Sequence, residues 1–304
     1  MPARTFPNSS RQRAFTLVEL LVVIGIIALL ISILLPVLGK VRVQAAATQC
    51  ASNLRGFGQA YLAYVDGNKG VSPPYRLPIN VTRSSIYGIG GKDVFRPRWY
   101  ELLGGTVKRY ANQSPKPIDD NSWTIDDAWF LCPAVPDWHN NRNYPYGYNF
   151  QFLGNPRLRA SDKRPINYPV KPGSIKGSIT VLALDCMGTA AGKPEATRAG
   201  YYNDGTKDRH ALGNKGVVVD PPRITPHSDI ADSAHTAPED RSGPHARHAG
   251  KLNVVFCDGH VERLTPQELG YVVRKDGSMT AYEAAGNNKL FSGSGADIDP
   301  PSKN

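Results

Sequence analysis

The sequence lacks the patterns that mark most disulfide-rich, metal-binding and hydrolytic proteins. It has four cysteines among 304 residues, too few for a disulfide scaffold, and no two of them have a CxxC or other zinc-site spacing. It contains neither the HExxH pattern of zinc proteases nor the GxSxG pattern of serine hydrolases. Long hydrophobic runs are also absent, apart from one near the N-terminus, which excludes a protein that crosses a membrane several times.

The overall composition indicates a folded but loop-rich chain. Hydrophobic residues make up 40% of the sequence and charged residues 20%, which excludes a fully disordered chain. The 29 glycines and 25 prolines lie almost wholly beyond residue 55, so many turns are expected there. The formal net charge of +10 permits an anionic partner such as a membrane surface, a nucleic acid or an acidic polysaccharide, but it selects none of them.

The one long hydrophobic run covers Leu20–Leu38 and contains no charged residue. As a helix it would be about 29 Å long at ~1.5 Å per residue, which matches the hydrocarbon core of a bilayer. A cleaved secretory signal has a shorter apolar core, so the run predicts a retained transmembrane helix. Residues 1–18 contain three arginines and no acid, which favours a cytoplasmic N-terminus and an extracytoplasmic body.

The residues around the start of this run carry a more specific signal. RAFTLVEL, at residues 13–20, resembles the class III signal of type IV prepilins and type II secretion pseudopilins. The resemblance implies that a prepilin peptidase removes residues 1–14 as a leader, cuts between Ala14 and Phe15, and N-methylates Phe15. Glu19 becomes the fifth mature residue, and Pro36 stands where the family often has a helix-bending proline. Ala14 departs from the glycine that the family usually has before the cut.

Glu19 is the only acid in the predicted transmembrane helix, and a carboxylate in a membrane is costly unless its charge is neutralised. Cleavage before Phe15 creates a positively charged amine at the same end of the helix. In a staggered helix bundle, the amine of one subunit can neutralise the carboxylate of the next, which lowers the cost of burying both. The expected partners are the prepilin peptidase, other pilin or pseudopilin subunits and inner-membrane lipid.

Apolar residues continue beyond the membrane run on one helical face, in steps of three and four, and predict that the helix extends to about Val65. The residues of this face are Val43, Ala47, Cys50, Leu54, Phe57, Tyr61 and Tyr64. Asp66-Gly67 should end the helix. We expect residues 15–38 to form the transmembrane and assembly helix and residues 39–66 to form its amphipathic continuation.

Beyond the helix, short apolar runs between glycine and proline clusters predict strands. These runs are Trp129–Cys132, Tyr148–Leu153, Ile179–Leu184, Asn253–Cys257 and His260–Leu264. The expected fold is α+β and pilin-like, with a long N-terminal helix, half of it transmembrane, packed on an antiparallel β-sheet head with long loops. The head should cover residues 67–285, and the composition of residues 286–304 predicts a disordered tail.

Asp258-Gly259 separates the last two of these runs and predicts a hairpin in which both turn residues have positive φ. Nine residues separate His248 from this dipeptide, an H-x9-DG arrangement that resembles the C-terminal motif of a large bacterial group of prepilin-like proteins. Further likenesses are CASNLR at residues 50–55, LCP at residues 131–133 and YGYN at residues 146–149. We interpret His248, Asp258 and Gly259 as parts of a structural turn.

The leading hypothesis is a structural subunit, an inner-membrane-anchored pseudopilin or minor pilin of a type IV pilus or type II secretion-like filament, with no catalytic residue, cofactor or metal. The alternative is a membrane-tethered extracytoplasmic metal-binding protein or hydrolase. It would use His245, His248, Asp258 and His260. Six basic residues within residues 157–176 are interleaved with prolines and indicate a solvated loop, so nucleic acid is not an expected partner.

An extracytoplasmic head would permit disulfides. Cys50 lies on the predicted buried face of the helix and Cys132 ends an apolar run, so the two should be buried together. This proximity favours a Cys50–Cys132 disulfide. The equally supported alternative is that all four cysteines are reduced, buried thiols.

Overall fold

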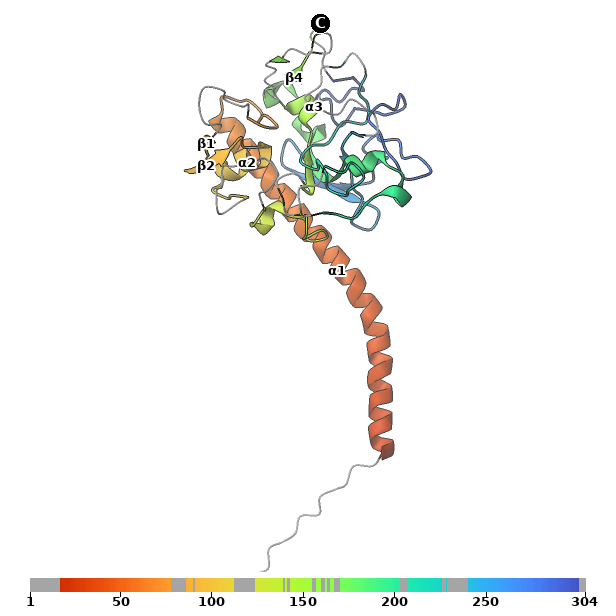
Figure 1. Cartoon of the computed structure of the whole chain (residues 1–304). Coiled ribbons are helices and arrows are strands. Elements are labelled where there is room, and N and C mark those ends of the chain that lie inside the picture. The colour runs from red at the N-terminus through yellow and green to blue at the C-terminus, as the bar shows by residue number, and fades with distance from the viewer. Residues whose placement is uncertain are drawn as a thin grey trace, which may run out of the picture. The chain divides into compact units, whose positions relative to one another are not determined.

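The structure is a computed structural model of the chain, shown in Figure 1. It divides into two compact units, with the boundary between Gln44 and Ala45. The residues that the structure describes are 17–77, 86–89, 91–111, 124–138, 140, 143–154, 157–159, 162, 165–166, 170–202, 207–225, 228 and 240–300. The predicted leader and the cleavage site between Ala14 and Phe15 lie outside these residues.

The described part of the N-terminal unit is the first part of α1 (Leu17–Gly67), a helix of 51 residues. Every leucine, isoleucine and valine side chain between Leu17 and Val43 is exposed. By length and composition α1 can cross a membrane, with a mean hydropathy of 3.2 in its most apolar window. Pro36 lies inside the helix. Because this surface is apolar on all sides, it needs lipid or other apolar helices around it.

The second part of α1 belongs to the C-terminal unit, the head, and buries one face there. The buried residues of the predicted face are Ala47, Cys50, Leu54, Phe57 and Tyr61. Val43 was also predicted on this face, but it lies in the other unit and is 47% exposed. The helix ends at Gly67, two residues beyond the predicted end, which is within the usual variation of helix boundaries.

The head is built on an antiparallel sheet in the order β3-β6-β8-β9, with β7 also paired to β6. Its strands are β3 (Tyr146–Tyr148), β6 (Val181–Gly188), β7 (Gly243–Pro244), β8 (Leu252–Phe256) and β9 (Val261–Leu264). In β8, Val255 packs in the core that contains α1, whereas Val254 and Phe256 pack in a second core. Since successive strand residues point to opposite faces, the sheet has a core on each face.

Smaller elements complete the head. β1 (Ile86–Ile89) and β2 (Lys92–Phe95) form a hairpin near α2 (Trp99–Thr106), and β4 (Arg157–Leu158) pairs with β5 (Pro165–Ile166) (Figure 1). The remaining helices are η1 (Ala128–Phe130), α3 (Phe150–Leu153), η2 (Pro172–Ser174), η3 (Gly177–Ile179), η4 (Thr189–Gly192) and η5 (Glu195–Thr197). The described parts of the head therefore combine one central sheet with many short turns.

Three of the five predicted strands are confirmed, since the runs Ile179–Leu184, Asn253–Cys257 and His260–Leu264 fall on β6, β8 and β9. The other two predictions were wrong. Trp129 lies in η1 because the Asp127 side chain accepts the backbone N–H of Trp129 and starts a turn. After β3, the N–H of Leu153 donates to the carbonyl of Asn149, so this apolar run coils into α3.

The turn between β8 and β9 differs from the predicted one. Gly259 has a φ of 90°, but Asp258 does not have a positive φ. The N–H of Gly259 donates to the carbonyl of Phe256, so the glycine follows the turn instead of standing at its centre. The Asp258 carboxylate accepts the N–H of His260 at 3.1 Å, which is the local reason for an aspartate here.

The prediction of a disordered tail was wrong for residues 286–300. Phe291 is fully buried and its ring packs against Tyr271 in the second core. The side-chain amide of Asn288 donates to the carbonyls of Arg223 and Ile298. The glycine- and serine-rich composition suggested disorder, but one buried aromatic ring and these hydrogen bonds offset the cost of ordering the segment.

Candidate functional site

Of the residues to which the predicted signal gives a role, Glu19 and Pro36 lie within the part of the chain that the structure describes. Glu19 lies in the first turn of α1 and is exposed. An acid in the first turn is favourable because the helix N-terminus carries partial positive charge. The neighbouring residues of the helix are apolar, so a positively charged partner at this end of the helix would pair with the Glu19 carboxylate.

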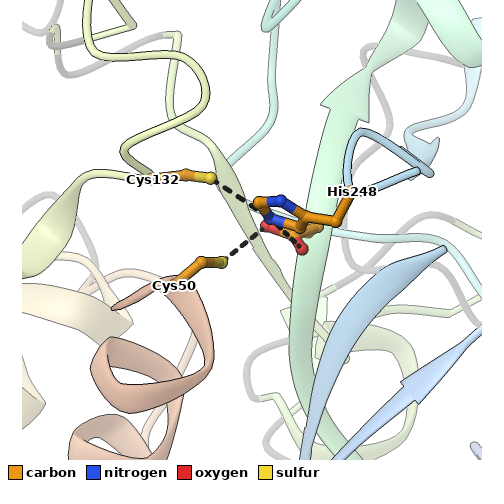
Figure 2. Close-up of side chains that lie close together, drawn as sticks. Cys50, Cys132 and His248 are labelled. Atoms are coloured by element: carbon orange, nitrogen blue, oxygen red, sulfur yellow. Dashed lines mark hydrogen bonds and ion pairs between the residues drawn. The ribbon is translucent and has the colours of Figure 1, made fainter. Parts of the chain in front are cut away.

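A second group of chemically active side chains lies inside the head. Cys50, Cys132, Asp185 and His248 come from distant parts of the sequence, and their potential ligand atoms all lie within 4.8 Å of one another. All four residues are 0% exposed. Figure 2 shows Cys50 on a helix, Cys132 on a loop and His248 beside a turn, with their side chains directed toward one another. We call these four residues the buried cluster.

Three distances define the buried cluster. The Cys50 thiol donates to Oδ1 of Asp185 across 3.2 Å. Nε2 of His248 lies 3.5 Å from Sγ of Cys132 and 3.3 Å from Oδ2 of Asp185. Among the described residues, Nδ1 of His248 has no hydrogen-bond partner. The imidazole is thus shared, through one nitrogen, between a sulfur and a carboxylate.

Asn53 holds α1 against the segment that carries Cys132. Asn53 follows Cys50 by three residues, so both lie on the same helical face. The Asn53 amide donates to the carbonyls of Ala128 and Leu131 at 3.3 Å and 2.8 Å. These two bonds fix η1 and the residue before Cys132 on the helix, which brings the two cysteines into one place.

Asn253 in β8 positions the carboxylate of the cluster. Its backbone N–H donates to Oδ2 of Asp185 at 2.8 Å, and its side-chain amide donates to the carbonyl of Ala47 in α1 at 3.0 Å. Asp185 itself lies in β6, whose residues are all buried. One asparagine therefore connects the two central strands and the helix around the cluster.

His248 directly precedes a tight two-residue turn. The sequence analysis predicted a turn of this kind at Asp258-Gly259 instead. Its backbone pairs with Lys251, and the two residues between them, Ala249 and Gly250, have φ values of 55° and 78°. Positive φ at both central positions is the geometry expected for a two-residue hairpin turn. This turn leads directly into β8 and sets the direction of the His248 side chain.

Arg247 supplies a buried positive charge beside the cluster. Its side chain is 4% exposed, and Nε lies 3.9 Å from Oδ1 of Asp185. Burial opposes ionisation of Asp185, but Arg247 and His248 together lower the pKa of this carboxyl. Burial also opposes the charged form of His248, yet the bonds to Asp185 and Cys132 raise its pKa to about 9. The neighbouring Cys50 thiol lowers the pKa of Cys132 to about 5, against the effect of burial.

The four residues of the alternative hypothesis are not brought together. Asp258 and His260 pair at the exposed end of the β8-β9 hairpin, with 2.6 Å between Oδ1 and Nδ1. His245 stacks on Trp138 with 5.6 Å between ring centroids, and burial lowers its pKa to about 3. His248 alone joins the buried cluster, with partners that the sequence analysis did not associate with it.

The structure places Cys50 and Cys132 together, as the sequence predicted, but as free thiols and not as a disulfide. Cys186 and Cys257 are also free and buried. The structure therefore corresponds to the alternative of four buried thiols. Two of these thiols belong to the buried cluster, whereas the other two do not.

The family described as the prokaryotic N-terminal methylation motif matches residues 9–35. The match covers the predicted cleavage site and the start of α1, and it supports a prepilin-type signal. Together with the apolar helix, this motif fits a type IV pilin-like or pseudopilin subunit. No curated protein and no solved structure matches the chain.

Proposed function

We propose that the chain is a membrane-anchored structural subunit of a type IV pilus or a type II secretion-like filament. The observation that carries this proposal is the overlap of the methylation motif with the exposed, predominantly apolar first part of α1. A helix of this kind cannot remain in water, since its side chains need lipid before assembly and neighbouring helices after it. A pilin-like subunit moves from the first of these environments to the second when it assembles.

Processing follows from the same proposal. A prepilin peptidase cuts between Ala14 and Phe15 and N-methylates Phe15. The residues after the cut then anchor the chain in the inner membrane. The arginines of the leader stay on the cytoplasmic side, because basic residues favour that side, and the head lies outside the cytoplasm.

The head has a non-catalytic role in this proposal. The buried cluster combines two thiols, a carboxylate and an imidazole, but each of its four residues is 0% exposed. A substrate cannot reach a nucleophile at that depth without opening of the core. We therefore assign the head to contacts with other subunits or with the secreted or displayed component, and not to hydrolysis.

Assembly should depend on the charge of Glu19. Glu19→Ala and Glu19→Gln are expected to leave membrane insertion intact, because both make the helix less costly to bury. Both should lower the yield of oligomers several-fold, because the amine of a neighbouring subunit would be buried without a counter-charge. The measurement is crosslinking in intact membranes with an amine-reactive reagent, followed by immunoblotting.

Glu19→Asp and Val18→Ala serve as matched controls. The first keeps the charge and the second changes an adjacent apolar side chain, so both should retain more oligomer than Glu19→Gln. If Glu19→Gln gave as much oligomer as the parent chain, the neutralisation argument would be wrong.

A further inference from the structure

We infer that Cys50, Cys132, Asp185 and His248 together bind one Zn²⁺ ion in a closed, four-ligand structural site. The ligands would be the two cysteine sulfurs, one carboxylate oxygen of Asp185 and Nε2 of His248. Zinc in structural sites is four-coordinate and tetrahedral, and cysteine, histidine and aspartate are the residues that supply its ligands. This site lies outside the membrane segment and does not depend on the filament role proposed above.

Three separations within the cluster are close to the edges of such a tetrahedron, and all of its ligand atoms lie within 4.8 Å of one another. With zinc–sulfur bonds of about 2.3 Å and zinc–nitrogen or zinc–oxygen bonds of about 2.0 Å, neighbouring ligand atoms lie roughly 3.3–3.8 Å apart. The separations are 3.2 Å from Cys50 Sγ to Asp185 Oδ1, 3.5 Å from Cys132 Sγ to His248 Nε2, and 3.3 Å from that nitrogen to Oδ2, the other oxygen of the Asp185 carboxylate. A direct imidazolium–carboxylate bond is shorter, about 2.7–2.9 Å. The 3.3 Å between His248 and Asp185 is therefore longer than the distance in a direct pair.

The charges around the cluster also suit a divalent cation. Two thiolates and the Asp185 carboxylate would carry three negative charges, which Zn²⁺ and the buried guanidinium of Arg247 would balance. Arg247 is fixed in this place because it also donates to the carbonyls of Pro145 and Cys186. A neutral total matters because uncompensated charge in a protein interior is costly.

The surrounding contacts indicate a structural and not a catalytic site. All four positions of the tetrahedron are filled by protein, whereas catalytic zinc keeps one position open. The backbone N–H of Asn253 donates to the Asp185 carboxylate. Residues that ligate a metal commonly have such a hydrogen-bond partner, which fixes their orientation. The ion would connect α1, the segment after η1, β6 and the turn before β8, four parts of the head that are distant in sequence.

The test begins with the metal content of the full-length chain, purified from membranes in detergent and reducing agent and then supplied with one equivalent of Zn²⁺. After gel filtration with a weak chelator, elemental analysis should find one zinc per chain. Cys132→Ser and His248→Ala should each lower zinc retention at least ten-fold. Cys257→Ser, which changes a buried thiol outside the cluster, should keep the metal. No zinc in the parent chain, or equal retention in all variants, would overturn the proposal.

X-ray absorption of the parent chain gives a readout that does not depend on whether variants fold. The spectrum should show two sulfur neighbours at about 2.3 Å and two nitrogen or oxygen neighbours at about 2.0–2.2 Å. A first shell without sulfur would place the zinc elsewhere. Thiol titration of a denatured, zinc-depleted sample purified without reducing agent should find four reactive thiols. A count of two, with Cys50 and Cys132 found in one disulfide-linked peptide, would contradict the site.

Discussion

Replacing Asp185 by alanine is expected to remove most of the stability of the head. The carboxylate is fully buried, and it accepts bonds from the Cys50 thiol and from the backbone of Asn253. Its loss would leave the buried charge of Arg247 without its carboxylate partner, and breaking a buried ion pair costs about 3–5 kcal/mol. A domain is stable by only about 5–15 kcal/mol, so the head should unfold at much lower denaturant concentration.

Tryptophan fluorescence during denaturant unfolding of the full-length chain can measure this loss, since all four tryptophans lie beyond residue 98 and report on the head. A chelator in every sample separates the effect of the carboxylate from that of any bound metal. Asp258→Ala is the matched control, because this carboxylate is 40% exposed in its pair with His260 and its loss should cost under about 1 kcal/mol. Equal losses in the two variants would show that Asp185 does not organise the core.

Gly58→Val is expected to separate α1 from the β8-β9 hairpin. A Cβ atom at Gly58 would lie 2.6 Å from Cα of Gly259 and 2.9 Å from Cγ2 of Val255. The first of these atoms is backbone and belongs to a residue with a φ of 90°, so it cannot turn aside as a flexible side chain could. Overpacking of this kind costs roughly 1–3 kcal/mol, and the whole helix would have to move away from the sheet to relieve it.

The control for this prediction is Gly67→Val in the same helix, because a Cβ atom there would meet nothing within 4 Å. Both variants introduce the same β-branched side chain, so the difference between them isolates the contact with the hairpin. The denaturation midpoint should fall for Gly58→Val and change little for Gly67→Val. A similar midpoint in both variants would mean that the helix and hairpin are not in tight contact.

The helix and the principal strands could be predicted from the sequence because their signals are local. The spacing of Cys50, Leu54 and Phe57 alone defines the buried face of α1, and the alternation along β8 depends only on neighbouring residues. One strand prediction failed where a single polar side chain changed the local geometry, because the Asp127 cap converts a strand-like apolar run into η1. The turn before β8 could not be predicted, because the residue type of Ala249 gives no signal for its positive φ.

The buried cluster could be predicted only in part. The sequence indicated three of its residues in other roles. Cys50 and Cys132 were predicted to form a disulfide, and His248 was interpreted as part of a structural turn. Asp185 was missed, although an acid within the apolar run VLALDC is a signal, because such a residue is rarely buried without a partner. The register that pairs β6 with β8 determines how these residues meet, and no local spacing contains that information.

The structure also gives a physical reason for several of the short motifs. Cys50 and Asn53 belong to CASNLR, Cys132 to LCP, and His248 to the H-x9-DG stretch, and all of them take part in or support one site. Gly259 of the same stretch closely approaches Gly58 in α1. The motifs therefore supply residues to one contact region between α1 and the central sheet.

The N-terminus of the mature chain tests the central claim most directly. The chain should be purified from membranes of the native host and its N-terminal peptide identified by mass spectrometry. The account predicts a chain that starts at Phe15 with one methyl group on its amine, as the match of the methylation motif to residues 9–35 suggests. A chain that starts at Met1, or near Ala46 after removal of the whole apolar helix, would contradict it.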